Sequence, residues 1–356
     1  MPKKTILSFL SLSFFFSTAC TGGELPADPA APIEETVTEE AVPTATPEPA
    51  LDLKDTKYTM FILNVHDWLL GEDSIETVNK VIDIHEEYEI PVNIYLTDPV
   101  VQLYVEEAPD LIERMKTSEY VTVSYHTRPP TPYYSDFDIV GLNELSDQEI
   151  YDTIMDYETH RLDLTTGLPT EEEGGYAYLT ELMGYAPITV GVASTHKNIE
   201  TQALKVYEDL GATFTLVHGR TSILGDTKGG LFLRPEQIEL KLYEAKALSA
   251  TAQKVIEDAM DAYAGDTSDG IFMNIKFHED NFYLSGTPWL SNFYTNGKES
   301  APKDTPFDIE TVNVKEKTDV EKTHIWELYE QGVKYVKDNA ETLHPISEFD
   351  LQDMLN

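Results

Sequence analysis

The sequence contains very little cysteine and very little arginine. Its 356 residues include one cysteine, Cys20, so an internal disulfide bond is excluded. Lys and Arg together number 25 against 64 Asp and Glu, which gives a formal net charge of −39. A field of that sign repels nucleic acid and anionic membrane surfaces, so we exclude both as partners. Only five residues are arginine, so the place of each one is informative.

The N-terminus carries a segment typical of secretion signals. Lys3 and Lys4 precede an apolar run over residues 6–16, which is too short to cross a bilayer comfortably as a helix. Small residues then lead to Cys20, as at a signal cleavage site. This order resembles a bacterial lipoprotein signal, in which Cys20 becomes the lipidated N-terminus, although Ser17 stands where leucine is usual. A plain signal peptide with a chance cysteine is the alternative.

Three segments are therefore predicted. Residues 1–19 form the lipoprotein signal peptide. Residues 20–54 are rich in Pro, Ala, Thr and Glu, cannot bury a core, and should be a disordered tether. Residues 55–356 should fold outside the cytoplasm, as a membrane-anchored lipoprotein on the cell surface or in the periplasm. The membrane would then be contacted only through the lipid.

Strands alternate with helices along the rest of the chain. Residues 58–65, YTMFILNV, are almost uniformly apolar, as expected of a strand buried on both faces of a parallel sheet. Further strands are expected at 92–96, 120–125, 187–193, 213–217, 231–233 and 271–277, and helices at 74–88, 100–116, 146–162, 174–183, 200–210, 249–264 and 319–338. Such βαβ units predict an α/β fold and favour a barrel. The long loop over 280–318, before the closing helix, is of the kind that is usually functional.

Histidines recur just after the predicted strands. Five follow a strand at once or within three residues: His66, His126, His196, His218 and His278. The carboxyl ends of parallel strands meet at one rim, where α/β folds keep their chemistry, so these side chains should converge beside Asp67. Imidazoles with a carboxylate suit a divalent metal such as zinc, or acid–base catalysis. For any one histidine alone, the alternative is that it merely caps its strand.

The order of these features resembles the polysaccharide deacetylase (NodB-homology) family over roughly residues 58–280. The family motif T-F-D-D-G corresponds to Asn64-Val65-His66-Asp67-Trp68, and H-[ST]-x-x-H corresponds to His126-Thr127-Arg128-Pro129-Pro130. The resemblance implies a distorted (β/α)7 barrel of the glycoside hydrolase/deacetylase type. It also implies an extracytoplasmic location and a carbohydrate ligand. Metal-activated water would remove N- or O-acetyl groups from a polysaccharide.

The resemblance also implies roles for single residues. Asp67 and His126 would bind the metal, and His278 would protonate the leaving group. His66 replaces the catalytic-base aspartate of the family, so it becomes a base or a third ligand. The sequence departs from the family where Pro130 replaces the second metal histidine and where Thr170 to Glu173 lack an arginine usual in the third region.

Arginines and aromatic residues near the strand ends are candidate substrate-binding groups. Arg128, Arg220 and Arg234 could clamp a carboxylate or sulfate through the two-pronged geometry of guanidinium, or pair with acids of the chain. Trp289 could stack on a sugar ring or pack within its loop. The same alternatives hold for other aromatic residues: Tyr133, Tyr134, Phe293 and Tyr294. His218 completes the predicted substrate-binding set.

Three functions remain open from the sequence. The first is a metal-dependent carbohydrate deacetylase, based on the strand-end histidines with Asp67. The second is a glycan-binding surface lipoprotein on a degenerate barrel, based on Pro130 and the missing arginine. The third is a barrel glycosidase that uses carboxylates among Asp67, Glu279 and Asp280, which requires a suitable separation between two of them.

Overall fold

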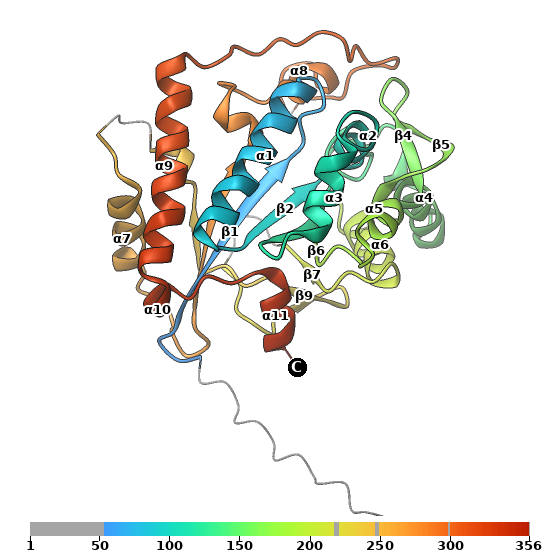
Figure 1. The fold of residues 1–356 in the computed structure, drawn as a ribbon. Coiled ribbons are helices and arrows are strands. Elements are labelled where there is room, and N and C mark those ends of the chain that lie inside the picture. The colour runs from blue at the N-terminus through green and yellow to red at the C-terminus, as the bar shows by residue number, and fades with distance from the viewer. Residues whose placement is uncertain (1–52, 217–220, 246–248, 298–299, 356) are drawn as a thin grey trace, which may run out of the picture. The chain divides into compact units, whose positions relative to one another are not determined.

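A curled sheet of nine strands forms the centre of the fold, with the order β10-β11-β1-β2-β3-β6-β7-β9-β8 (Figure 1). All neighbouring strands pair in parallel except β8 and β9. The strands are β1 Lys57–Val65, β2 Val92–Leu96, β3 Val121–His126, β6 Thr189–Gly191, β7 Phe214–Thr215, β8 Thr227–Lys228, β9 Leu231–Leu233, β10 Ile238–Leu240 and β11 Ile271–His278. The sheet forms a half-barrel, which confirms the predicted α/β barrel class.

The computed structural model describes residues 53–216, 221–245, 249–297 and 300–355. They belong to one unit that spans Leu51–Asn356. The predicted signal peptide, Cys20 and nearly all of the predicted tether lie outside the described residues, as do His218 and Arg220. Across the ranges that are described, none of the helices combines the length and the apolarity needed to cross a membrane.

Helices connect the parallel strands and cover the sheet. Their bounds are α1 Gly71–Tyr88, α2 Asp98–Glu107, α3 Pro109–Thr117, α4 Asp147–Thr159, α5 Gly175–Met183, α6 Lys197–Asp209, α7 Ala252–Ala262, α8 Pro288–Phe293, α9 Asp319–Asp338, α10 Ala340–Leu343 and α11 Glu348–Met354. Short 3-10 turns lie at Leu142–Glu144, Leu242–Glu244 and Glu279–Phe282 (η3). Helices α1 and α9 lie side by side next to β1 (Figure 1).

Two predicted elements differ in detail from the structure. The helix expected at 100–116 is two helices that meet at Ala108, because Pro109 disfavours helical geometry in the residue before it. The segment after α4 forms an antiparallel hairpin of β4 His160–Asp163 and β5 Leu168–Glu173. Since β5 is mostly exposed and acidic, it lacks the apolar pattern that marks a strand in sequence.

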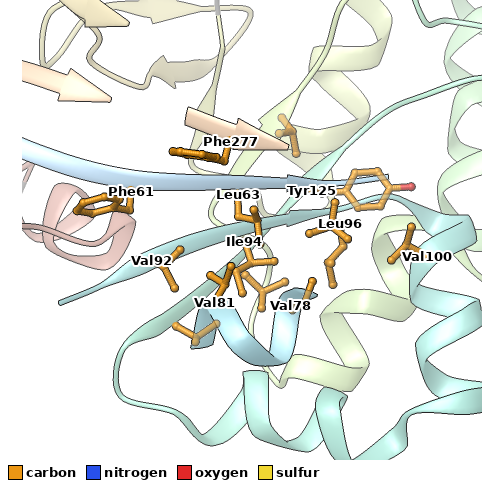
Figure 2. Packing of buried hydrophobic residues seen from close by; sticks show 14 of the residues in the cluster. Phe61, Leu63, Val78, Val81, Val92, Ile94, Leu96, Val100, Tyr125 and Phe277 are labelled. Atoms are coloured by element: carbon orange, nitrogen blue, oxygen red, sulfur yellow. The ribbon is translucent and has the colours of Figure 1, made fainter. Parts of the chain in front are cut away.

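The hydrophobic core lies between the sheet and its covering helices. Val78 and Val81 of α1 point toward Leu63 of β1 and Ile94 of β2, and all four side chains are fully buried (Figure 2). On α1 the two valines are three residues apart, which places them on one helix face. Strand β1 is almost entirely buried along its length, as its apolar run predicted.

A buried polar network lies near α11, which sits at the end of the sheet where β1 begins (Figure 1). Glu348, the first residue of α11, is fully buried and accepts hydrogen bonds from Tyr95 of β2 and Ser124 of β3. The Nη1 atom of Arg234 lies 3.7 Å from Glu348 Oε1, and its Nη2 lies 3.0 Å from Glu236 Oε2. Arg234 thus pairs with acids of the chain, the alternative to ligand binding that the sequence left open.

We predict that Glu348→Ala lowers the free energy of unfolding by about 3–5 kcal/mol, because it leaves a buried guanidinium and two buried hydroxyls short of their acceptor. Chemical denaturation measures the loss. Glu341→Ala, at an exposed position of α10, is the matched control and should change little. Equal stability of Glu348→Ala and the wild type would contradict a structural role for this network.

Candidate functional site

The ends of β1 and β11 place the first functional residues side by side. These strands pair in parallel over their whole length, with Asn64 opposite His278. The residues that follow each strand therefore leave the sheet at the same rim. His66 and Asp67 follow β1, and η3 begins with Glu279 directly after β11. Parallel pairing of β1 with β11 thus places His66 and His278 at the same edge of the sheet, as expected for the histidines that follow strands.

Glu279 joins the two chain segments at this rim. Its Oε1 accepts the backbone N–H of His66 at 2.9 Å and that of Asp67 at 2.5 Å. The side chain is completely buried, and its Oε2 has no hydrogen-bond partner among the described residues. Burial, followed by the charges of Asp280 and Asp67, raises the pKa of Glu279 well above its ordinary value.

His66 and His278 form a hydrogen-bonded imidazole pair. His66 Nε2 lies 3.1 Å from His278 Nδ1, and the rings are nearly perpendicular at 88°. One nitrogen must donate and the other accept, so the two tautomers are linked. Burial, with a smaller effect of Arg128, lowers the pKa of His66 and lowers that of His278 to about 3. Both rings are therefore neutral near pH 7.

Asp67 uses both carboxylate oxygens within the protein. Its Oδ1 accepts the backbone N–H groups of Leu69 at 2.9 Å and Leu70 at 3.3 Å, which shapes the turn into α1. Its Oδ2 accepts the hydroxyl of Tyr283 at 2.9 Å. Tyr283 was not predicted from the sequence, because no motif marks it and its partner lies 216 positions away.

Arg128 and His126 occupy the rim after β3. The Nη1 atom of Arg128 lies 2.9 Å from His126 Nδ1 and donates to the carbonyl of Thr127 at 2.9 Å. The His126 ring packs on Gly191 of β6, where an added Cβ would lie only 3.0 Å from His126 Nδ1. Glycine therefore allows the close approach of β6 to this ring.

Aromatic rings connect Arg128 to the imidazole pair. The guanidinium carbon lies 5.0 Å from the centre of the Tyr134 ring and 5.6 Å from that of Trp289. The Trp289 ring in turn makes an edge contact with His66, at 6.1 Å between centroids. Helix α8, within the predicted functional loop, thus contributes Trp289 to the site.

Asp280 is the second carboxylate of η3. Its Oδ1 accepts a hydrogen bond from Asn281 at 3.2 Å, and its buried Oδ2 has no partner in the described part of the chain. Burial, followed by the charge of Asp67, raises the pKa of Asp280 to about 7. Asp67, Glu279 and Asp280 influence one another electrostatically, so we infer that they carry fewer than three charges at neutral pH.

A cavity of about 610 Å³ lies beside η3. It is lined by residues that include Tyr243, Asn281, Ser285, Thr287 and Lys317. The Tyr243 ring contacts His278 at 6.1 Å between centroids, and Asn281 is a hydrogen-bond partner of Asp280. Tyr243 thus lies between the cavity and His278, and the cavity offers space for part of a ligand next to the site.

The residues predicted for a divalent metal do not fit one in the described structure. No group of three or more His, Cys, Asp or Glu side chains there could hold a metal ion. Both oxygens of Asp67 are engaged, and the Arg128 guanidinium stands against His126 Nδ1. Zinc therefore stays a prediction, and we derive no chemical step through a metal.

The structure brings together most of the predicted site residues. A continuous chain of contacts runs from His278 through His66, Trp289 and Arg128 to His126, and Asp67 lies beside it. His196 lies at the N-cap of α6 and has no hydrogen bond or ring contact with any described member of this chain. His218 and Arg220 lie outside the described residues.

Comparisons with known proteins give only distant matches. No family model and no curated protein matches the sequence. The solved structure of peptidoglycan deacetylase PdaC from Bacillus subtilis is 12% identical, covers 84% of this chain and 91% of its own, and gives a TM-score of 0.40. The Bc1960 peptidoglycan N-acetylglucosamine deacetylase is 12% identical, covers 62% and 72%, and gives 0.33.

A third solved structure has a different activity. The 4-alpha-glucanotransferase from Thermococcus litoralis is 14% identical, covers 64% of this chain and 34% of its own, and gives a TM-score of 0.37. Similarities this low do not establish a family. We therefore base the function on the geometry of the site.

We predict that Glu279→Ala lowers the free energy of unfolding by about 2–5 kcal/mol, because two buried backbone N–H groups lose their acceptor. Glu279→Gln is the matched control. Its amide oxygen can accept both N–H groups, and its NH₂ would take the place of the unpartnered Oε2, so it should stay close to wild-type stability. Denaturation of the three proteins tests this prediction, and equal losses in both variants would contradict it.

Proposed function

We propose that this chain is a carbohydrate-acting hydrolase of the deacetylase kind, which removes acetyl groups at the rim formed by β1, β3 and β11. The observation that supports this most is the chain of contacts from the His66–His278 pair through Trp289 to Arg128. It combines groups that can move protons with a buried cation. The resemblance of the sequence to polysaccharide deacetylases supplies the substrate class.

The residues present suggest how the proton would move. Asp280 Oδ2 has no hydrogen-bond partner among the described residues, and the pKa of Asp280 is raised to about 7, so this carboxylate is suited to exchange a proton near neutral pH. In the proposed reaction it takes a proton from water as the water oxygen attacks the acetyl carbonyl. The bond from the carbonyl carbon to the sugar nitrogen or oxygen then breaks, acetate leaves, and the sugar atom receives the proton.

The imidazole pair has a supporting role in this scheme. Burial lowers the pKa of His278 to about 3, so near pH 7 the ring is neutral when it takes the predicted role of protonating the leaving group. Its Nδ1 contact with His66 can relay a proton between the two neutral rings. Trp289 is buried in an aromatic cluster with residues that include Tyr134 and Phe293, which is the packing alternative that the sequence left open beside stacking on a sugar.

Glycan binding without turnover is the second candidate. It is favoured by the contact of Arg128 with His126 and by the engaged oxygens of Asp67, which leave no metal-binding group among the described residues. Acetate release separates this candidate from the first. We propose for either function that the protein works outside the cytoplasm on a lipid anchor at Cys20.

We predict that Asp280→Asn lowers kcat for acetate release from acetylated oligosaccharides by about 100-fold or more, since it removes the proton acceptor. In the wild type, kcat/KM should rise with pH through about 7, because the carboxylate form is the active one and predominates above its pKa. This limb of the pH profile should vanish in the variant. Asp110→Asn, at an exposed position of α3, is the control.

Two outcomes of that experiment would contradict the proposed mechanism. Equal rates for Asp280→Asn and the wild type would remove Asp280 from the reaction. Glycan binding without acetate release would favour the second candidate. An EDTA arm tests the metal separately: loss of activity that zinc restores would reinstate metal-dependent catalysis, with a ligand such as His218 from outside the described residues.

We predict that Cys20→Ser moves the protein from the membrane fraction to the soluble fraction of a bacterial host, because the residue that would carry the lipid is lost. Labelling with a radioactive fatty acid should mark the wild type and not the variant. Thr36→Ala, in the predicted tether, leaves the whole signal unchanged and is the control. Equal membrane fractions and equal labelling of wild type and Cys20→Ser would refute the anchor.

A further inference from the structure

The arginines of this chain are paired in a consistent way. Of the four arginines in the described ranges, three each form ion pairs with two carboxylates. The pairs are Arg114 with Asp83 and Glu86, Arg161 with Glu106 and Glu172, and Arg234 with Glu236 and Glu348. In a chain with 64 acidic residues, such pairing is the expected state of an arginine.

Arg128 differs from the other three. It has no ion pair with any described carboxylate, although only 8% of its surface is exposed. Burial of a guanidinium without a counter-charge is costly, and a fold normally offsets that cost with a carboxylate. Glu279 and Asp280 influence Arg128 electrostatically but make no hydrogen bond to it.

The unused donors of Arg128 lie along one edge of the guanidinium. Nη1 is engaged by Thr127 and His126. Nε is buried and has no acceptor among the described residues. The hydrogen bonds found for Arg128 within those residues both use Nη1, and none uses Nη2. The Nε–Nη2 edge presents two parallel N–H groups, which is the arrangement that binds both oxygens of a planar carboxylate.

The surroundings of Arg128 favour an ion pair with a ligand. The Tyr134 and Trp289 rings, at 5.0 and 5.6 Å, reduce the local dielectric and so strengthen the attraction to an anion. Neutral His66 and His278 bring no charge that would compete for that anion. The same Trp289 ring contacts His66, so an anion on Arg128 would lie next to the proposed reaction site.

We propose that Arg128 is the receptor for a sugar carboxylate, so that the substrate is an acetylated glycan that contains uronic-acid units. The proposal rests on the proposed function for the carbohydrate nature of the ligand. It goes beyond that function by naming the charge of the substrate and the residue that selects it. The net charge of −39 repels an acidic glycan at a distance, so the attraction must come from the local contact with Arg128.

The first experiment measures the receptor without catalysis. The purified protein, labelled with ¹⁵N-arginine, is titrated with glucuronate and with its neutral methyl ester, and the Nε–H signals are followed. Arg128→Lys identifies the signal of Arg128. We expect this signal to shift with glucuronate, and glucuronate to bind about tenfold or more tightly than the ester.

Variants separate recognition from folding. Arg128→Gln should bind glucuronate and the methyl ester equally weakly. Arg128→Lys should retain part of the preference for glucuronate, because it keeps the positive charge but loses the two parallel N–H groups. Arg114→Gln, which removes an arginine paired with acids of the chain, should keep the wild-type preference. The proposal that Arg128 binds the sugar carboxylate would be overturned if glucuronate left the Arg128 signal unmoved. It would also be overturned if Arg128→Gln still preferred glucuronate over its methyl ester.

Two further arms separate this inference from the proposed function and from other anions. Acetate release is measured from acetylated glucuronate and acetylated glucose. Glucuronate binding without any acetate release refutes the hydrolase and leaves the receptor standing, whereas equal kcat/KM values for the two substrates refute the uronate preference alone. Inorganic sulfate that shifts the Arg128 signal as strongly as glucuronate would overturn the assignment to a carboxylate.

Discussion

The site depends on one interaction, the carboxylate of Glu279 that accepts the backbone N–H groups of His66 and Asp67. Parallel pairing of β1 with β11 brings the two strand ends together, but it stops where the strands stop. Beyond that point the Glu279 side chain binds the backbone of His66 and Asp67. It therefore holds the segment after β1 against the end of β11, where His278 lies. Without it, beyond the paired strands, the two segments would be joined by the His66–His278 contact and by the hydrogen bond from Tyr283 to Asp67.

Two buried arginines of the fold have opposite surroundings. Arg234 is paired with Glu236 and Glu348, so the buried charges are balanced and serve stability. Arg128 lacks an ion pair with any described carboxylate, and Asp280 Oδ2 has no hydrogen-bond partner among the described residues. An arrangement that is costly for stability in this way is typical of sites that complete their interactions with a ligand.

The sequence predicted those parts of the fold that depend on local pattern. Apolar runs marked the strands of the sheet except β8 and β10, and the structure places His66, His126, Arg128 and His278, which come after predicted strands, in one chain of contacts. His196 also comes after a predicted strand but lies outside this chain of contacts, because the protein continues past β6 to the start of α6 before that side chain is reached. Three features could not be predicted, because each acts on residues more than 200 positions away. They are Glu279 as a backbone acceptor, Tyr283 as the partner of Asp67, and α11 with Glu348. Pairing at such separation leaves no periodic trace in one sequence.

The position of Arg128 also bears on the chemistry that the rim can perform. The sequence resemblance gave His126 to a metal, whereas in the structure a guanidinium stands 2.9 Å from His126 Nδ1. A fixed guanidinium can orient and neutralise an anion, but it cannot ionise a bound water as a metal does. In the proposed reaction, the proton of water is instead accepted by a group whose pKa lies near neutrality, and burial raises the pKa of Asp280 to about 7. The proposed roles of Arg128 in binding an anion and of Asp280 in accepting a proton thus both fall on buried side chains at the same carboxylate-rich rim.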